Sequence, residues 1–419
     1  LGTFTMKNKK IVIDNFISLA FLQGVTYILP LVTFPFLVRV LGPVKYGLVT
    51  FSQCFIMYFV LLIDYGFNYS ATREISIYRN DIGRLSGIVA SVTAIKLLLL
   101  AVSFAVFSCV LFLAPKFSSE KTLYYFSFLA VLGNVLMPAW FFMGIEKMNY
   151  IMYLSILSKV IYTVCIFVFI TGPEGYLLVP LFNGLGGIFS GLIAIYVLFK
   201  TFKIRPLVPR ISEIARQLKE GWHVFISTMA ISAYSNTRMF AVGLLCSETV
   251  TGYYAIAEKL INIIQSTYLI PLAQTVFPRL SNVFHADPGK AFNMMRRLQS
   301  LTTMLYLLFL PPLFILAPHI ISLIAKNVYP ETLLSFRILL IAAFFTSANA
   351  FRVQFLLISG RNKIYADIHM LAGTIGVVLT FLFAYLYSYI GPPFSMLIVE
   401  ITVLLLTVIS VRQSCPDRA

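Results

Sequence analysis

The sequence predicts an all-α integral membrane protein with about 12 transmembrane helices in two six-helix bundles. Hydrophobic residues make up 59% of the chain and charged residues only 11%, whereas a soluble domain has roughly 45–50% apolar and 25% charged residues. The mean hydropathy is +0.89. Runs of about 20 apolar residues recur along the chain, and a helix of that length crosses a hydrocarbon core of about 30 Å.

Each apolar run between charged residues or Pro and Gly breaks is predicted as one span. In order, the predicted spans are residues 11–37, 44–67, 84–112, 122–143, 149–170, 176–199, 222–245, 250–275, 298–325, 331–357, 363–389 and 394–411.

The longest polar connection follows span six and divides the chain into two sets of six spans. We therefore predict an N-terminal six-helix bundle over 1–199, a cytoplasmic linker over 200–221 and a C-terminal six-helix bundle over 222–419. Within the linker, "ISEIARQLKE" has apolar positions at helical spacing with Arg and Lys between them. That pattern predicts a short amphipathic helix on the cytoplasmic membrane surface.

The net charge of +16 follows from topology. With both termini in the cytoplasm, inner segments hold 21 of the 32 basic residues and outer segments hold 5, so the positive-inside rule fixes the orientation. A nucleic-acid partner would require a soluble basic domain, and no loop is long enough to form one.

The two halves show a faint sequence repeat. "FIS" opens span one and recurs at the start of span seven, and "GLVTFSQ" at 47–53 corresponds to "GYYAIAEK" at 252–259. This alignment pairs Gly47 with Gly252 and Gln53 with Glu258. It indicates a duplication, as in many transporters that carry substrate at the interface of their repeats. In span six, the GxxxG spacing from Gly187 predicts close helix packing.

Placing an ionisable residue near the centre of a transmembrane helix costs at least about 2.5–3.5 kcal/mol. Each such residue inside the spans is therefore expected to have a structural or functional role. Basic residues in deep or outer positions outnumber acidic ones, which favours a water-filled cavity that receives an anion. The predicted anion-binding residues are Lys96, Lys159, Arg238, Lys259 and Arg337. The alternative is that these residues form buried ion pairs that fix helix packing.

Three acidic residues are candidates for proton or sodium coupling: Glu258, Glu400 and Asp64. Glu258 and Lys259 are neighbours on one helix and point about 100° apart, so each needs a partner elsewhere. Asp64 and Arg352 are predicted near inner span ends, where snorkelling can satisfy them.

Several classes of chemistry lack support in the sequence. No G-x-x-x-x-G-K-[ST] stretch is present, so we expect no ATP site in a P-loop and no other cofactor. The five cysteines form no CxxC or Cys/His cluster, so we expect neither a metal site nor disulfides. The outer connections are short and the histidines fall mostly on the inner side, so we expect no catalytic residues and no enzyme activity.

Several segments of the sequence resemble those of a known family. "QGVTYILPLVTFPFLVRVLGP", "YGLVTFSQ", "GYYAIAEKL" and "PLAQTVFPRLS" are similar to segments of the Wzx-type O-antigen flippases. These are polysaccharide transporters of the MOP exporter superfamily, which also contains the MATE transporters. The similarity runs from about Asn15 to Arg412.

The resemblance implies a multi-pass protein of the inner membrane of a Gram-negative bacterium. Such proteins move undecaprenyl-diphosphate-linked oligosaccharide from the cytoplasmic to the periplasmic leaflet by alternating access. It also implies a cationic lumen, contact with membrane lipid, and association with an O-antigen polymerase and a chain-length regulator. Family members often carry an acidic residue where this chain has Asn236-Thr237-Arg238, which leaves ion coupling at that position unsupported.

Two further classes of function stay open on the sequence. One is another exporter of the same superfamily, either a lipid II flippase or a drug/cation antiporter; the antiporter would favour an acidic, aromatic pocket over a basic one. The other is an intramembrane polysaccharide polymerase, which the short outer loops disfavour.

Overall fold

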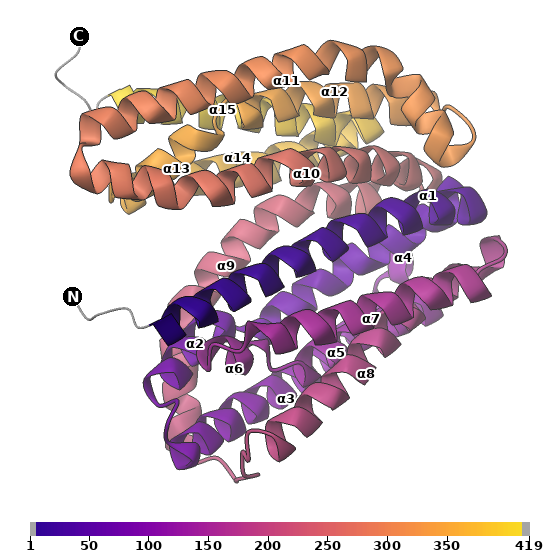
Figure 1. The fold of residues 1–419 in the computed structure, drawn as a ribbon. Coiled ribbons are helices and arrows are strands. Elements are labelled where there is room, and N and C mark those ends of the chain that lie inside the picture. The colour runs from indigo at the N-terminus through magenta and orange to yellow at the C-terminus, as the bar shows by residue number, and fades with distance from the viewer. Residues whose placement is uncertain (1–5, 413–419) are drawn as a thin grey trace. The chain divides into compact units, whose positions relative to one another are not determined.

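A computed structural model describes the backbone of residues 6–412. It describes the side chains of residues 24 and 28–411, apart from 223, 227, 230–235, 270, 271, 274 and 278. Across this described part every regular element is a helix (Figure 1). Eight stretches of it are long and apolar enough to cross a membrane on length and composition alone. The first contains the end of predicted span one and all of span two, and the last contains predicted spans eleven and twelve. With the structural similarities reported below, this confirms the all-α membrane fold of twelve helices in two six-helix bundles.

The elements follow one another in the order of the predicted spans. They are α1 (Met6–Asp64), α2 (Phe67–Ile77), α3 (Ile82–Leu113), α4 (Pro115–Ser118), α5 (Lys121–Leu136), α6 (Ala139–Gly144), α7 (Met148–Phe169), η1 (Pro173–Leu177), α8 (Leu178–Lys200), α9 (Ile211–Leu245), α10 (Glu248–Ala286), α11 (Pro288–Ala325), α12 (Pro330–Ser347), α13 (Ala350–Ile358), α14 (Asn362–Tyr387), η2 (Ser388–Ile390) and α15 (Gly391–Arg412). Spans one and two both lie in α1, which is kinked at Gly42 with φ 70°.

Three spans are broken where the sequence predicts continuous helices. Span two runs past its predicted end, because α2 continues it after a turn at Tyr65 and Gly66 with φ 44° and 76°. Span four consists of α5 and α6, separated at Met137 and Pro138. Proline has no N–H and disfavours the helical conformation in the residue before it, which explains this break. Span ten consists of α12 and α13.

The two halves of the chain share local features that support the predicted duplication. Span four of the first half and span ten of the second half are both broken. The third helix of each half begins at an aspartate that caps it: Asp81 accepts a hydrogen bond of 3.0 Å from the backbone N–H of Arg84, and Asp287 one of 2.9 Å from that of Lys290. An aspartate in this position satisfies an N–H that has no partner within the helix.

The helices form two compact units. Unit 1 contains Leu1–Phe34 and Ser52–Ser232, and unit 2 contains Pro35–Phe51 and Ala233–Ala419. The helices α1 and α9 therefore each contribute to both units, and the units do not follow a single cut of the chain between spans six and seven.

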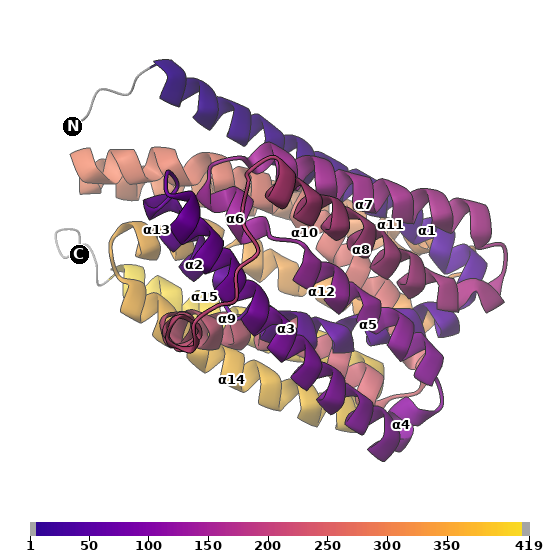
Figure 2. The same ribbon diagram turned by 90° about the horizontal axis from the view of Figure 1, so that it is seen from below.

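In unit 1, α5 and α8 lie side by side with their backbones in close contact (Figure 2). A Cβ atom on Gly133 of α5 would lie 2.9 Å from the carbonyl carbon of Gly187, and one on Gly191 would lie 2.5 Å from Cβ of Leu136. The GxxxG pattern of span six is thus a helix-packing surface, as predicted.

In unit 2, residues 35–51 of α1 pack closely against the later helices. Gly47 lies against Gly252, so that a Cβ on Gly47 would lie 2.5 Å from the backbone nitrogen of Gly252, and a Cβ on Gly252 would overlap the carbonyl oxygen of Pro43. The two glycines that the sequence repeat pairs are therefore in direct contact. Arg39 donates hydrogen bonds to the carbonyls of Leu323 and Ile324, and so satisfies the last turn of α11.

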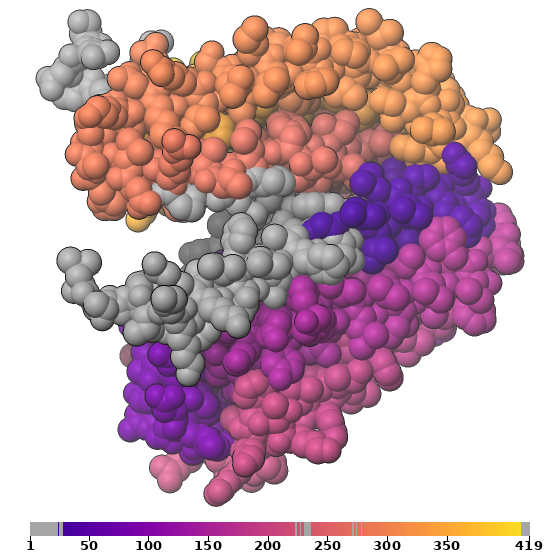
Figure 3. Space-filling model, viewed as in Figure 1, coloured from indigo at the N-terminus to yellow at the C-terminus, as the bar shows by residue number. Residues whose placement is uncertain are grey.

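The helix α11 lies at the surface of unit 2, where it is coloured orange in Figure 3, and several of its exposed side chains are large and apolar. Met304, Leu308, Ile315 and Leu323 are each at least 66% exposed. Side chains of this kind on a long helix are expected to face lipid acyl chains.

The predicted short surface helix is not a separate element. Residues 211–220 form the first turns of α9, which continues to Leu245. Gln217 in this stretch is 1% exposed, because one face of the helix packs against the rest of unit 1 rather than against solvent.

We predict that Gly252→Ala destabilises the protein by about 1–3 kcal/mol, because the added methyl group has no space beside Pro43. Gly24→Ala is the matched control, since no atom of the described residues lies within 4 Å of the added one, and alanine is otherwise favoured over glycine in a helix. The melting temperatures of the purified proteins in detergent give the comparison. Equal melting temperatures for the two variants would contradict the close contact.

Candidate functional site

The predicted site residues divide between the two units. Lys96, Lys159 and Asp64 belong to unit 1, whereas Arg238, Lys259, Arg337, Glu258 and Glu400 belong to unit 2.

In unit 1, Lys96 pairs with Asp64. The Nζ atom of Lys96 lies 3.2 Å from Oδ1 of Asp64 and 3.4 Å from Oδ1 of Asn134, and its side chain is only 3% exposed. Both acceptors stand at the ends of helices: Asp64 is the last residue of α1, and Asn134 lies two residues before the end of α5. The ammonium group is thus placed where two broken helices present the negative ends of their dipoles.

This geometry corrects the sequence-based position of Asp64. We expected it near the inner end of span two, where it would snorkel to water. Instead the span continues for another 11 residues as α2, and the carboxylate meets a lysine from the middle of α3. The pair fits the alternative of a buried ion pair that fixes helix packing.

In unit 2, Arg238 of α9 pairs with Glu258 of α10. Nε of Arg238 lies 3.4 Å from Oε1 of Glu258, with side chains 13% and 11% exposed. The hydroxyl of Tyr254, one turn earlier, donates to the same carboxylate oxygen at 3.3 Å. As expected from helix geometry, Glu258 finds its partner on another helix and not in the adjacent Lys259.

The remaining predicted residues are less enclosed. Lys159 on α7, Lys259 on α10 and Glu400 on α15 are half-buried. Arg337 on α12 is also half-buried, and its guanidinium carbon lies 4.7 Å from the centre of the Phe314 ring of α11. Such a cation–π contact holds a charge without neutralising it.

Gln299 is a buried polar group that sequence reasoning missed. It is 3% exposed on α11, and its side chain spans the break in span ten. The amide nitrogen donates to the carbonyl of Ser347 at 2.8 Å, and the amide oxygen accepts from the backbone N–H of Phe351 at 3.0 Å. Arg352 donates to the carbonyl of Ala348 in the same break. Gln299 therefore satisfies backbone groups that a continuous helix would satisfy itself.

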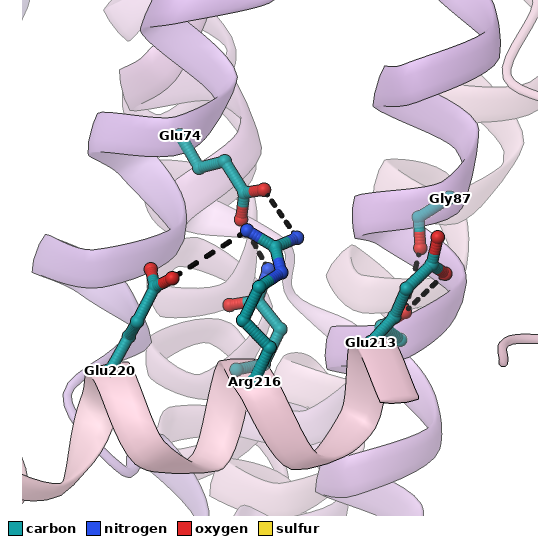
Figure 4. A network of polar contacts seen from close by, with 7 residues as sticks. Glu74, Gly87, Glu213, Arg216 and Glu220 are labelled. Carbon is teal, nitrogen blue, oxygen red and sulfur yellow. Dashed lines mark hydrogen bonds and ion pairs between the residues drawn. The ribbon is translucent and has the colours of Figure 1, made fainter. Parts of the chain in front are cut away.

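A second missed group connects α2 with the first turns of α9 (Figure 4). Arg216 donates to Glu74 at 2.6 Å and lies 3.6 Å from Glu220, and Gln217 also donates to Glu74. The hydrogen bond to the Glu74 carboxylate raises the pKa of Arg216 above its ordinary value. These residues lie more than 140 positions apart in the chain, so no local pattern indicates the contact.

The same stretch of α9 also contacts α3 and the turn between α1 and α2. The hydroxyl of Ser91 lies 2.9 Å from the carbonyl oxygen of Gly87 and 3.4 Å from Oε2 of Glu213, so that one O–H serves both acceptors. The hydroxyl of Tyr65 donates to the carbonyl of Leu218 at 3.2 Å. The start of α9 therefore makes polar contacts with α2, with α3 and with the turn between α1 and α2.

Comparison with known proteins gives one family and several relatives. Residues 12–284 match the model of a family described as polysaccharide biosynthesis protein. The chain is 27% identical to a protein of Escherichia coli (strain K12) named "Putative O-antigen transporter", over 97% of this chain and 98% of that protein. A protein of the same name from Shigella dysenteriae is 24% identical, over 95% and 99% of the two chains.

Two solved structures share the fold. The inward-facing conformation of a multidrug resistance MATE family transporter of the MOP superfamily has a TM-score of 0.70 and 15% identity, covering 97% of this chain and 100% of that one. The lipid II flippase MurJ in an inward closed conformation also has a TM-score of 0.70 and 15% identity, with 96% and 87% covered.

We predict that Lys96→Met alone destabilises the protein by about 3–5 kcal/mol, because it leaves the Asp64 carboxylate without its partner. The double variant Lys96→Met with Asp64→Leu should recover most of this loss, since no buried charge remains. Thermal unfolding of the four proteins of this cycle measures the coupling. Lys363→Met, at an exposed position, is the control for loss of one positive charge. Additive losses would show that the two residues do not interact.

Proposed function

The chain belongs to the polysaccharide biosynthesis protein family, and from this membership we propose that it is a flippase for lipid-linked O-antigen units. It is a multi-pass membrane transporter of the MOP superfamily. The proposed substrate is an undecaprenyl-diphosphate-linked oligosaccharide, which moves from the cytoplasmic to the periplasmic leaflet by alternating access. The observation that carries the proposal is the end-to-end similarity to a relative named as an O-antigen transporter.

The charges within the spans support an anionic substrate. A diphosphate binds Arg and Lys through charge-assisted hydrogen bonds, which are strongest where water is excluded. Lys159, Lys259 and Arg337 are half-buried, and we propose that they contact the diphosphate or acidic sugars. The prenyl tail can stay in lipid, so that only the polar part needs a wet path.

Arg238 and Lys96 have a different proposed role, because each already has a carboxylate partner. We propose that the diphosphate competes with Glu258 for Arg238. When the arginine turns to the substrate, Glu258 loses its counter-charge and takes up a proton or a sodium ion. This exchange would couple transport to an ion gradient; Glu400 and Asp64 are the other proposed coupling residues. Lys96 is the most buried of the five predicted anion-binding residues. It would reach the substrate only if its ion pair with Asp64 opened.

The proposal also covers the orientation of the protein in the membrane and its partner proteins. The basic residues support an inner-membrane protein with both termini in the cytoplasm. We propose that the delivered unit passes to an O-antigen polymerase and a chain-length regulator associated with the transporter. The relatives are named as transporters, so polymerisation is assigned to another protein.

The proposal predicts that the chain restores surface O-polysaccharide to a strain that lacks its own O-antigen flippase. In proteoliposomes, it should carry undecaprenyl-diphosphate-linked oligosaccharide across the bilayer, measured by access of an external glycosidase. Lipid II in parallel proteoliposomes tests the alternative suggested by the fold. Transport of lipid II with no transport of the oligosaccharide would contradict the assignment.

We expect Arg238→Gln with Glu258→Gln to fold but to transport at least about tenfold more slowly, since a charge-assisted hydrogen bond contributes about 1.5–3 kcal/mol. The double change avoids an unpaired buried carboxylate.

Lys159→Ala should also abolish surface polysaccharide, whereas Lys363→Ala, at an exposed position, should not. Gel analysis of lipopolysaccharide, with membrane protein levels measured in parallel, reports the result. Normal polysaccharide in both site variants would overturn the cationic path.

Glu258→Gln tests the coupling step separately, with a proton or sodium gradient imposed on the proteoliposomes. We expect transport by this variant to be insensitive to either gradient. A gradient response equal to that of the unsubstituted protein would exclude Glu258 as the coupling residue.

A further inference from the structure

The connection between α8 and α9 combines exposed apolar and basic side chains in an extended segment. Residues 203–210 form no helix, and Pro206 and Pro209 favour this extended backbone. We call residues 200–211 the connecting segment.

The connecting segment is fixed to unit 1 at its beginning. Ile204 is 3% exposed within the apolar core of the unit, and Phe202 packs against the same core. The backbone N–H of Arg205 donates to the hydroxyl of Ser86 on α3 at 2.9 Å. The segment is therefore held against the bundle, and its later side chains have a defined place.

Beyond that attachment, the apolar side chains point away from the protein. Val208 is 95% exposed, Ile211 is 85% exposed and Leu207 is 48% exposed. Aliphatic side chains this open to water are unfavourable, because the hydrophobic effect scales with exposed apolar area. A surface that covers them is needed.

The charges indicate what covers the segment. Lys200, Lys203, Arg205 and Arg210 are all exposed, and no acidic residue occurs between Lys200 and Ser212. The segment leaves α8 at Lys200, and the 23 residues of this helix span about 34 Å, close to the hydrocarbon thickness. The segment thus starts at headgroup level, where basic side chains meet lipid phosphates and aliphatic ones reach the acyl boundary.

We propose that the connecting segment is a lipid-binding surface, with Val208 and Ile211 inserted into the membrane leaflet and its basic residues bound to acidic phospholipid headgroups. This inference requires only that the chain spans a membrane, and it does not depend on the transported substrate.

Beyond Ile211, the neighbouring amphipathic stretch of α9 cannot serve this role. We expected residues 211–220 to lie on the membrane surface, but Glu213, Arg216 and Gln217 are engaged with α2 and α3 (Figure 4). Lipid contact therefore moves to the extended residues before α9 and to the first residue of α9, Ile211. Lipid bound there would hold the start of α9 at a fixed depth in the bilayer.

The test uses the full-length protein in nanodiscs with Val208→Trp as the probe. The unsubstituted protein provides the background from its two tryptophans, and Asn80→Trp, at an exposed position between α2 and α3, is the matched control. We expect Val208→Trp to emit at shorter wavelength and to be quenched more by lipids with brominated acyl chains than Asn80→Trp. Brominated phosphatidylglycerol should quench it more than brominated phosphatidylcholine.

Charge reversal tests the headgroup contact. Arg205→Glu and Arg210→Glu on the Val208→Trp background should each reduce the preference for the anionic lipid by about fivefold. Equal quenching at positions 208 and 80 would overturn lipid contact. Short-wavelength emission without lipid quenching would assign the segment to a protein contact instead. Quenching with no anionic preference would overturn the binding of acidic headgroups.

Discussion

A polar group inside the hydrocarbon of a membrane must find its partner within the protein, and the broken helices of this chain depend on that constraint. A break frees backbone N–H and C=O groups that would be hydrogen-bonded within a regular helix. It also leaves a helix end whose dipole is not compensated by a following turn. In unit 1, the ammonium of Lys96 stands beside two such ends through Asp64 and Asn134. In unit 2, the amide of Gln299 spans the break in span ten.

The two repeats thus meet the same requirement with different chemistry. The lysine and the carboxylate form a pair of opposite charges, whereas the amide is neutral. The ionic partner in unit 2 lies elsewhere, between Arg238 and Glu258, on the first two helices of the second repeat. The two halves share a broken helix and differ in the groups that support it.

Composition and apolar run length were sufficient to predict the twelve spans, because each span must be apolar over nearly its whole length. The breaks were harder to predict: Pro138 interrupts span four, but its apolar neighbours hide the interruption, and Tyr65 and Gly66 gave no comparable signal. The predicted site residues were chosen because charges inside a membrane are costly, but the partners of these residues could not be predicted from the sequence. Asp64 and Lys96 are 32 positions apart, and Glu74 and Arg216 are 142 apart. Such pairs depend on tertiary packing alone.

The docking of residues 35–51 in unit 2 has a consequence for biosynthesis. The ribosome makes this segment first, but Gly252 and the carbonyls that Arg39 caps are made more than 200 residues later. Early helices must therefore remain in the bilayer with small and polar surfaces uncovered until the second repeat is inserted. The second half, made alone, would lack a piece of its own interior, so the two halves depend on each other to fold.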